Sequence, residues 1–285
     1  MKHLLFIVFF SLMCLACSQF DNEANNTKLP PPSFNNSGPI ISSHRGHYLY
    51  PENTYEAIEA AIMAGFKMVE FDIQMTKDSV LVIHHDYTVD RCSNGTGVIS
   101  KNTYEDLSRF DYGSWKGEEF SGIRLATLES VIQLAKWKNV LLEIDMTAHN
   151  SSSLVIDKAY EMVERYNMVD KVLFIVIASN AKRVSTISKN KANVSVLVPV
   201  EPERDKKYAL QELFSIVSNE HYSYCCIKKD LITHEIFNLC KEKGARVEVW
   251  GIKTENELDE YIEEMRCDNI MVEDFIPQLF NRNTN

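Results

Sequence analysis

Short apolar runs alternate with amphipathic segments along most of the chain. Nine runs have the length and β-branched content of strands, and they cover residues 40–44, 68–73, 80–84, 140–145, 172–178, 194–200, 222–227, 246–250 and 269–272. Many are apolar at consecutive positions, which is expected of strands buried on both faces. Helical spacing of apolar residues follows at 54–64, 128–136, 153–166, 181–189, 206–217, 233–243 and 255–265.

A strand followed by a helix, repeated roughly eight times in about 250 residues, predicts an α/β fold: a (β/α)8 TIM barrel in a single domain. A doubly wound open sheet is the alternative, but no glycine-rich phosphate loop follows the first strand. Residues 86–125 form one long irregular insertion, which is either functional or decorative. Its aromatic residues Phe110, Tyr112 and Trp115 form a lid or a headgroup wall, or simply cover the barrel end.

The chain begins with the pattern of an export signal, predicted over residues 1–17. Its apolar run is too short to span a bilayer. The segment Met13-Cys14-Leu15-Ala16-Cys17 resembles a bacterial lipoprotein cleavage site, which would make Cys17 the lipidated residue, with Cys14 a second candidate. We therefore expect an exported protein that faces the periplasm or the cell exterior and binds the membrane through an N-terminal lipid anchor.

Residues 18–37 are rich in Asn, Ser and Pro, which predicts a flexible tether before a barrel domain at residues 38–285. The formal net charge is -10 and no dense Lys/Arg run occurs, so nucleic-acid binding is not expected. No protein partner is evident. Seven cysteines are present. Without Cys14 and Cys17 they form an odd, unevenly spaced set, which is typical of free thiols rather than of a disulfide framework.

Acidic residues recur with the two-residue period of a strand. Glu70 and Asp72 point to one face of their strand, and Glu143 and Asp145 do the same on theirs. Active sites of TIM barrels lie where the strands end, so these side chains are expected in the barrel mouth. Salt bridges to lysine or arginine are one explanation of the acids. A hard divalent cation bound through oxygen atoms is the other, and the nearby histidines favour it.

Two histidines follow strand ends at the same mouth. His44 and His85 are candidates for a general base and a general acid. His84 has the opposite parity to His85, so it should point away from the mouth. Arg45 can bind a phosphate with two parallel hydrogen bonds.

These residues belong to an ordered set that resembles the glycerophosphodiester phosphodiesterase family. The set comprises His44-Arg45-Gly46, Pro51-Glu52-Asn53-Thr54, Glu70-x-Asp72, His85-Asp86, Arg91, Asn94-Gly95-Thr96-Gly97, Thr127-Leu128-Glu129, Glu143, Trp250 and a terminal segment from Asp268 to Pro277. The resemblance implies a TIM barrel with one divalent cation, Ca²⁺ or Mg²⁺. It assigns the metal ligands Glu70, Asp72 and Glu143 and the acid/base pair His44 and His85. Of the substrate-binding residues that it implies, Arg45 would bind the phosphate, Asn53 would support the site and Trp250 would line the glycerol end.

At Asp145 the sequence departs from the family, which usually has a lysine there. One possibility is that Asp145 joins the metal ligands. A second is that a lysine compensates its charge, with Lys228 or Lys229 as the preferred donor and Lys253 also in reach. A third is that Asp145 is solvated at the rim. We favour compensation by Lys228 or Lys229, whose ammonium would lie near Asp145 or near the substrate phosphate.

The expected activity is metal-dependent hydrolysis of a glycerophosphodiester to glycerol phosphate and an alcohol, by histidine acid/base catalysis. Two alternatives remain. One is a phospholipase of the phosphatidylinositol-specific C or sphingomyelinase D type, which forms a cyclic phosphate. The other is a catalytically weak surface binding protein, suggested by the acid at position 145.

Overall fold

The structure, a computed structural model, describes residues 33–35, 38–147, 152–199, 203–219 and 221–280 of the 285-residue chain. Pro32–Asn285 forms one compact unit. The predicted export signal, with Cys14 and Cys17, lies outside the described residues, as does nearly all of the predicted tether.

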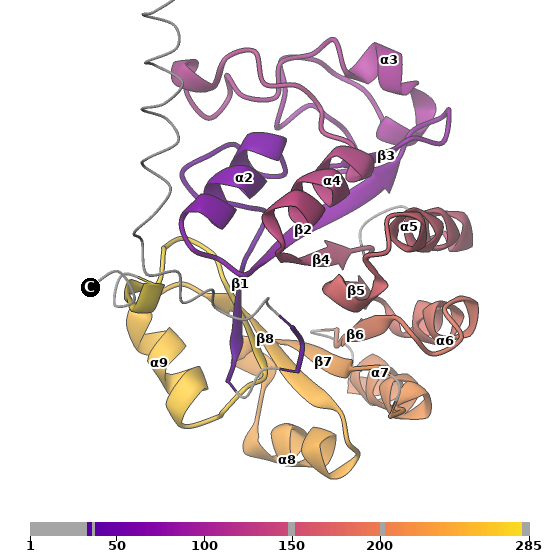
Figure 1. Cartoon of the computed structure of the whole chain (residues 1–285), viewed down its shortest axis with the longest axis vertical. Coiled ribbons are helices and arrows are strands. Elements are labelled where there is room, and N and C mark those ends of the chain that lie inside the picture. Colours follow the sequence, from indigo (N-terminus) through magenta and orange to yellow (C-terminus); the bar gives the residue numbers. More distant parts are fainter. Residues whose placement is uncertain (1–32, 36–37, 148–151, 200–202, 220, 281–285) are drawn as a thin grey trace, which may run out of the picture. The chain divides into compact units, whose positions relative to one another are not determined.

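Eight parallel strands close into a barrel in this unit (Figure 1). They are β1 (Ile40–Ser43), β2 (Met68–Met75), β4 (Leu141–Asp145), β5 (Val172–Val176), β6 (Asn193–Leu197), β7 (Ser223–Lys228), β8 (Arg246–Ile252) and β9 (Asn269–Val272). Strand β1 pairs with β9 on one side and with β2 on the other, which closes the ring. The predicted TIM barrel is confirmed.

The apolar run predicted at residues 80–84 is a strand, but it lies outside the barrel. β3 (Leu81–Ile83) pairs antiparallel with β2, with Ile73 opposite Ile83. The main-chain N–H of His84 then donates to the carbonyl of Asp72 at 3.0 Å. This hairpin-like pairing brings the residues after β3 to the mouth of the barrel, although β3 itself is not a strand of the barrel.

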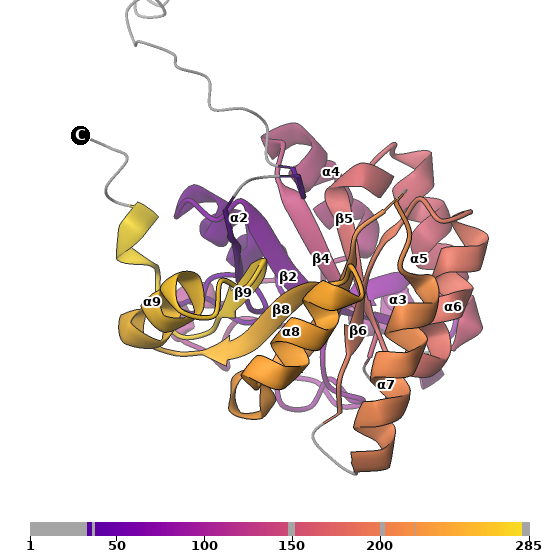
Figure 2. The same ribbon diagram turned by 90° about the horizontal axis from the view of Figure 1, so that it is seen from below.

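Helices surround the barrel on its outer side (Figures 1 and 2). They are α2 (Tyr55–Met63), α4 (Leu128–Lys138), α5 (Ser153–Arg165), α6 (Ala178–Ile187), α7 (Glu203–Ile216), α8 (His234–Glu242) and α9 (Glu255–Glu263). Four of them begin after a threonine whose hydroxyl accepts a hydrogen bond from a main-chain N–H of the first turn: Thr54, Thr127, Thr233 and Thr254. Such caps satisfy donors that have no partner within the helix.

Strand β2 shows how the alternating pattern divides the core. Val69, Phe71 and Ile73 pack in the large apolar layer between the barrel and its helices. Glu70 and Asp72 point the other way, into the barrel. At the amino ends of the strands the interior is closed by an apolar group: Phe34, Ile40, Met68, Leu141, Leu173 and Tyr224. The inward-facing polar side chains therefore lie toward the carboxyl ends of the strands, where the site is.

The long insertion at residues 86–125 contains α3 (Tyr104–Leu107) and two short 3-10 turns, Ile99–Lys101 and Glu118–Phe120. It shares a small apolar core with β3: Val82, Val89, Ile99, Leu107, Tyr112, Ile123 and Leu125. Tyr112 is buried there and Phe110 packs beside it, whereas the Trp115 side chain is exposed and borders a cavity at the barrel mouth.

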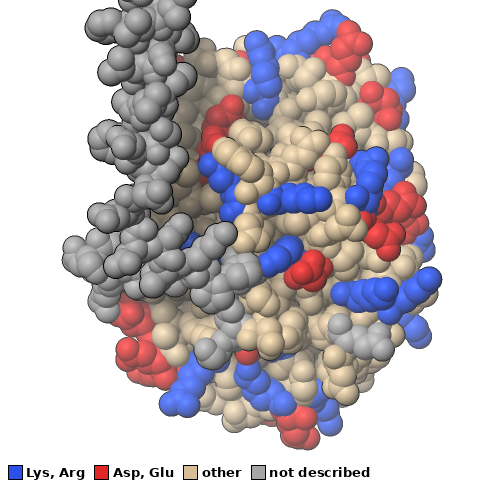
Figure 3. Space-filling model, viewed as in Figure 1, with Lys and Arg blue, Asp and Glu red and all other residues tan. Residues whose placement is uncertain are grey.

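Within the described residues, no helix is both long enough and apolar enough to cross a bilayer. On the face shown in Figure 3, basic and acidic side chains are interspersed rather than gathered by sign.

Candidate active site

Three carboxylates meet at the carboxyl ends of β2 and β4. Glu70, Asp72 and Asp145 each offer an oxygen atom that lies within 4.8 Å of the other two. Glu70 and Asp72 face inward because they occupy alternate positions of β2, and the strand register pairs Asp72 with Asp145. Such a group of oxygen donors can hold a divalent cation.

Asn53 holds the second of these carboxylates in place. Its side-chain amide donates to Asp72 Oδ2 at 2.8 Å, and its carbonyl oxygen accepts from the Asp72 main-chain N–H at 3.0 Å. Asn53 is buried and has a φ of 56°, a left-handed conformation that Asn tolerates better than most residues. The predicted role of Asn53 near the site is thus a supporting contact to Asp72.

Arg45 lies between the same acids. Its main-chain N–H donates to Glu70 Oε2 at 2.8 Å, and its Nε lies 3.2 Å from Asp72 Oδ2. Like Asn53, it has a φ of 56°. These contacts fix the start of the side chain at the mouth, where a guanidinium can meet a phosphoryl group.

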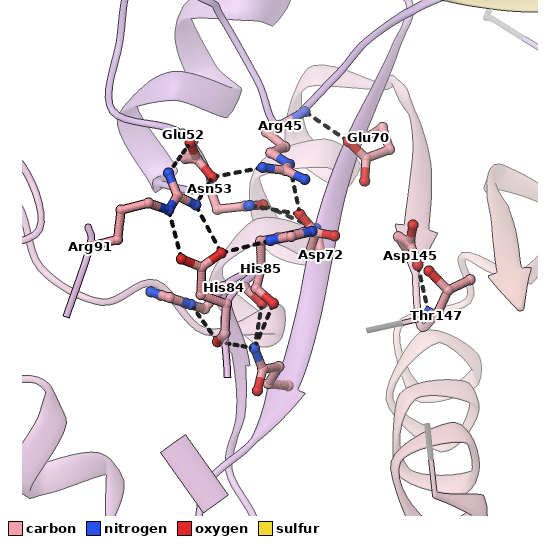
Figure 4. Close-up of polar contacts among 12 residues, drawn as sticks. Arg45, Glu52, Asn53, Glu70, Asp72, His84, His85, Arg91, Asp145 and Thr147 are labelled. Atoms are coloured by element: carbon pink, nitrogen blue, oxygen red, sulfur yellow. Dashed lines mark hydrogen bonds and ion pairs between the residues drawn. The ribbon is translucent and has the colours of Figure 1, made fainter. Parts of the chain in front are cut away.

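The two candidate histidines border one cavity of about 200 Å³, together with the three carboxylates and Arg45. His85 Nδ1 lies 2.7 Å from Asp86 Oδ1. His84 turns away, as its parity predicts: its Nδ1 lies 3.1 Å from the carbonyl of Asp86, and its ring meets the edge of Tyr112. Figure 4 shows His85 and His84 on different sides of the chain.

The carboxyl groups of Glu70 and Asp145 have raised pKa values. Burial and the neighbouring Asp72 raise the pKa of the Glu70 carboxyl well above its usual value. The same two causes raise the pKa of Asp145 to about 7. A bound cation would remove the cost of keeping these carboxylates ionised. The donor set therefore fits a divalent metal ion.

Glu143 lies at a different depth from Asp145, and it does not join the carboxylate group found among the described residues. Glu143 is fully buried, and its Oε1 accepts from the amide of Asn269 at 2.9 Å. Burial and the charge of Glu248 raise its pKa. Glu143 lies opposite Glu70 in the register of β2 and β4, while the grouped carboxylates are Glu70, Asp72 and Asp145.

Neither preferred lysine pairs with Asp145, which is one of the two places where the compensating charge is expected. In the described part of the chain no lysine ammonium lies within 4.0 Å of its carboxylate, which instead accepts the Thr147 main-chain N–H at 2.5 Å. Lys229 reaches outward to Glu257 of α9. Lys228 pairs with Asp230 at 3.1 Å, in the 3-10 turn Lys229–Leu231 that follows β7.

Trp250, predicted to line the glycerol end, does border the cavity. The Lys228 ammonium lies over the Trp250 ring, 6.0 Å from the ring centre. Lys253 is engaged with Glu273 at 3.3 Å. Of the described lysine and arginine residues, Arg45 is the one that borders the carboxylate cavity.

The structure adds two contacts that the sequence interpretation missed. Gln74, the next inward residue of β2, donates from Nε2 to the carbonyls of His84 at 3.2 Å and His85 at 2.9 Å. Extending the alternation of Glu70 and Asp72 by one step would have found it. Arg91 of the insertion bonds to both Glu52 and Asp86, and no periodic pattern signals that contact.

A TIM barrel with carboxylates and histidines at the carboxyl ends of its strands has the layout of a metal-assisted enzyme site. The sequence matches the glycerophosphoryl diester phosphodiesterase family over residues 44–276, and the chain belongs to this family.

Curated relatives agree with this assignment. The chain is 35% identical over 140 residues to a glycerophosphodiester phosphodiesterase of Caldanaerobacter subterraneus, covering 47% of this chain and 56% of that protein. It is 25% identical over 263 residues to glycerophosphodiester phosphodiesterase 1 of Rattus norvegicus, covering 83% and 79%. The chain spans about half the length of the bacterial relatives it matches.

Solved structures share the fold. A phosphodiesterase of Oleispira antarctica, in complex with the product sn-glycerol-3-phosphate, has a TM-score of 0.73 at 22% identity, covering 86% of this chain and 96% of that one. A glycerophosphodiester phosphodiesterase of Agrobacterium tumefaciens has a TM-score of 0.67 at 20% identity, covering 85% and 99%.

Proposed function

We propose that this protein hydrolyses glycerophosphodiesters to glycerol phosphate and an alcohol, with one bound divalent cation and with His44 and His85 as the acid/base pair. The observation that carries the proposal is the single cavity bordered by both histidines, Arg45 and the three grouped carboxylates. Family membership supports it, as do the named activities of the curated relatives.

Glu70, Asp72 and Asp145 would hold the cation, and oxygen donors of this kind suit Ca²⁺ or Mg²⁺. A bound cation would supply Lewis acidity at the phosphoryl oxygen and lower the pKa of a nearby hydroxyl. Glu143 stays a ligand predicted from the family resemblance alone.

The remaining chemistry belongs to the protein side chains. One histidine takes the proton of the glycerol 2-hydroxyl, whose oxygen attacks phosphorus within the same molecule. The bond from phosphorus to the alcohol oxygen breaks, and the other histidine gives a proton to that oxygen. Water then opens the cyclic phosphate to glycerol phosphate. Arg45 binds the phosphoryl oxygens through these steps, and Trp250 borders the glycerol.

Product analysis tests the proposal. Purified protein with added Ca²⁺ or Mg²⁺ is incubated with a panel of glycerophosphodiesters, and phosphorus NMR follows the products. Glycerol phosphate as the final product supports the proposal. A cyclic phosphate that accumulates without further hydrolysis would assign the phospholipase-type reaction instead. Absence of any product across the panel would indicate a binding protein.

The amino-terminal segment completes the proposal. The protein is exported and attached to the membrane through a lipid on Cys17, on the strength of the cleavage-site pattern in its sequence. In a bacterial host, Cys17→Ser should move the protein from the membrane fraction to the soluble fraction. If Cys17→Ser stays with the membrane while Cys14→Ser releases the protein, the attachment site is Cys14.

A further inference from the structure

The Arg91 guanidinium joins two carboxylates at the edge of the candidate active site (Figure 4). It donates to Glu52 from Nη1 at 2.9 Å and from Nη2 at 2.8 Å. It also donates to Asp86 from Nε at 2.6 Å and from Nη2 at 3.0 Å. A single exposed ion pair contributes little, but paired hydrogen bonds to two acids form a network with fixed geometry.

Asp86, one of the two carboxylates that Arg91 contacts, determines which nitrogen of His85 carries the proton. The hydrogen bond from Arg91 holds the pKa of Asp86 well below its usual range, so Asp86 is ionised. An ionised carboxylate can only accept hydrogen bonds. His85 must therefore carry a proton on Nδ1, which lies 2.7 Å from Asp86 Oδ1. Its Nε2 is then the nitrogen that exchanges protons.

Glu52, the other carboxylate that Arg91 contacts, also binds Arg45. Arg45 Nη1 donates to Glu52 Oε1 at 2.9 Å, the same oxygen that Arg91 contacts. Burial alone would raise the pKa of Glu52, but the hydrogen bonds from Arg91 and the charge of Arg45 lower it to about 2. Glu52 is thus ionised and can hold both guanidinium groups at once.

The packing of its neighbours in the insertion fixes the position of Arg91. Two residues before it, Val89 is buried in the apolar core that the insertion shares with β3, and its N–H donates to the carbonyl of Gly97 at 3.0 Å. Cys92, the residue after it, is also buried. A lysine at position 91 could not reproduce four hydrogen bonds in two directions, because its ammonium lacks the planar fork of a guanidinium.

We propose that Arg91 is a positioning residue that couples the two sides of the active site, orienting His85 through Asp86 and Arg45 through Glu52. The insertion at residues 86–125 then serves to deliver this guanidinium. The inference rests on the proposed function for its effect on catalysis, but the geometry of His85 can be tested without it.

Kinetics with a simple glycerophosphodiester test the catalytic effect. Arg91→Lys keeps the charge and should lower kcat by about 10²-fold, since small misplacements of reacting groups cost this much. KM should rise as well, because Arg45, which binds the phosphate, loses the support that Arg91 gives to Glu52. The control is Arg109→Met, which removes an exposed arginine of the same insertion paired with Glu105. Wild-type kcat in Arg91→Lys, or a rise in KM alone, would overturn the proposal.

Nitrogen NMR of the histidine side chains tests the geometry independently of activity. In the wild-type protein, neutral His85 should be protonated on Nδ1, and Arg91→Met and Asp86→Asn should both shift it toward a mixture of tautomers. Arg109→Met should leave the wild-type spectrum unchanged. If wild-type His85 is protonated on Nε2, the positioning role is wrong. If the tautomer behaves as expected but no variant hydrolyses any diester, the proposed function fails while the network stands.

Discussion

Asn53 and Asp72 are joined by two hydrogen bonds, both through the Asn53 side chain: its amide nitrogen donates to the Asp72 carboxylate, and its amide oxygen accepts from the Asp72 main-chain N–H. The pair fixes one carboxylate of the candidate metal site from a loop that β1 and α2 hold in place. Removing groups that orient metal ligands in this way typically lowers metal affinity or activity by about 10–100-fold.

Removing the Asn53 side chain should weaken metal binding. Asn53→Gly is the suitable change, because glycine accepts the φ of 56° without strain. We expect the affinity for Ca²⁺ or Mg²⁺, measured by titration calorimetry, to fall by about 10–100-fold. Asn139→Gly is the matched control, since Asn139 has a φ of 55° at the end of α4. Equal affinity in both variants would show that Asp72 needs no support from Asn53.

The neighbouring histidines should differ in kind. His85→Ala and His44→Ala should each lower kcat by about 10²-fold or more, because each removes an acid or base. His84→Ala should mainly lower the melting temperature, because His84 is buried against Tyr112 and away from the cavity. Steady-state kinetics and thermal unfolding separate the two effects. A kcat loss in His84→Ala as large as in His85→Ala would contradict the geometry.

In the metal-free protein, the stability that Asp145 contributes should decrease as pH rises. Burial and Asp72 raise the pKa of Asp145 from 3.8 to about 7 in the folded protein, so the folded state binds more protons than the unfolded state in between. The contribution of Asp145 to the free energy of unfolding should therefore fall from about pH 4 to pH 7. Urea unfolding in the presence of a chelator measures this, and Asp145→Asn should show a shallower slope. Equal slopes in the wild-type protein and Asp145→Asn would rule out the raised pKa.

Asp145 and Glu143 compete for the place of the third ligand. The grouping of Glu70, Asp72 and Asp145 predicts that Asp145→Asn lowers metal affinity about tenfold or more, since the number of charged ligands sets affinity. Glu143→Gln should lower it less. Calorimetric titration of both variants decides between them. A larger loss in Glu143→Gln would support the ligand set that the family resemblance implies.

Hydrophobic periodicity was enough to predict the barrel and the inward faces of its strands. It placed Glu70 and Asp72 in the mouth, because the face of a strand residue depends on parity alone. It could not give depth: Glu143 and Asp145 share a face but lie two residues apart, about 7 Å along the strand. Nor could it give strand direction, so the run at residues 80–84 resembled a barrel strand.

Contacts made by long side chains and irregular segments were beyond prediction. Parity placed Lys228 and Lys229 after β7 but said nothing of Asp230 and Glu257, the acids that hold them away from Asp145. Arg91 bonds to Glu52, which lies 39 residues away in sequence, from an insertion without periodicity. Such contacts depend on the packed conformation of both segments rather than on local pattern.

The most direct test of the account is the rate at which purified protein releases glycerol phosphate from a glycerophosphodiester, followed by phosphorus NMR before and after exhaustive chelation. We expect steady release with Ca²⁺ or Mg²⁺ present, loss of release after chelation, and recovery when the cation is restored. Undiminished release by the chelated protein would contradict the metal-dependent site formed by Glu70, Asp72 and Asp145.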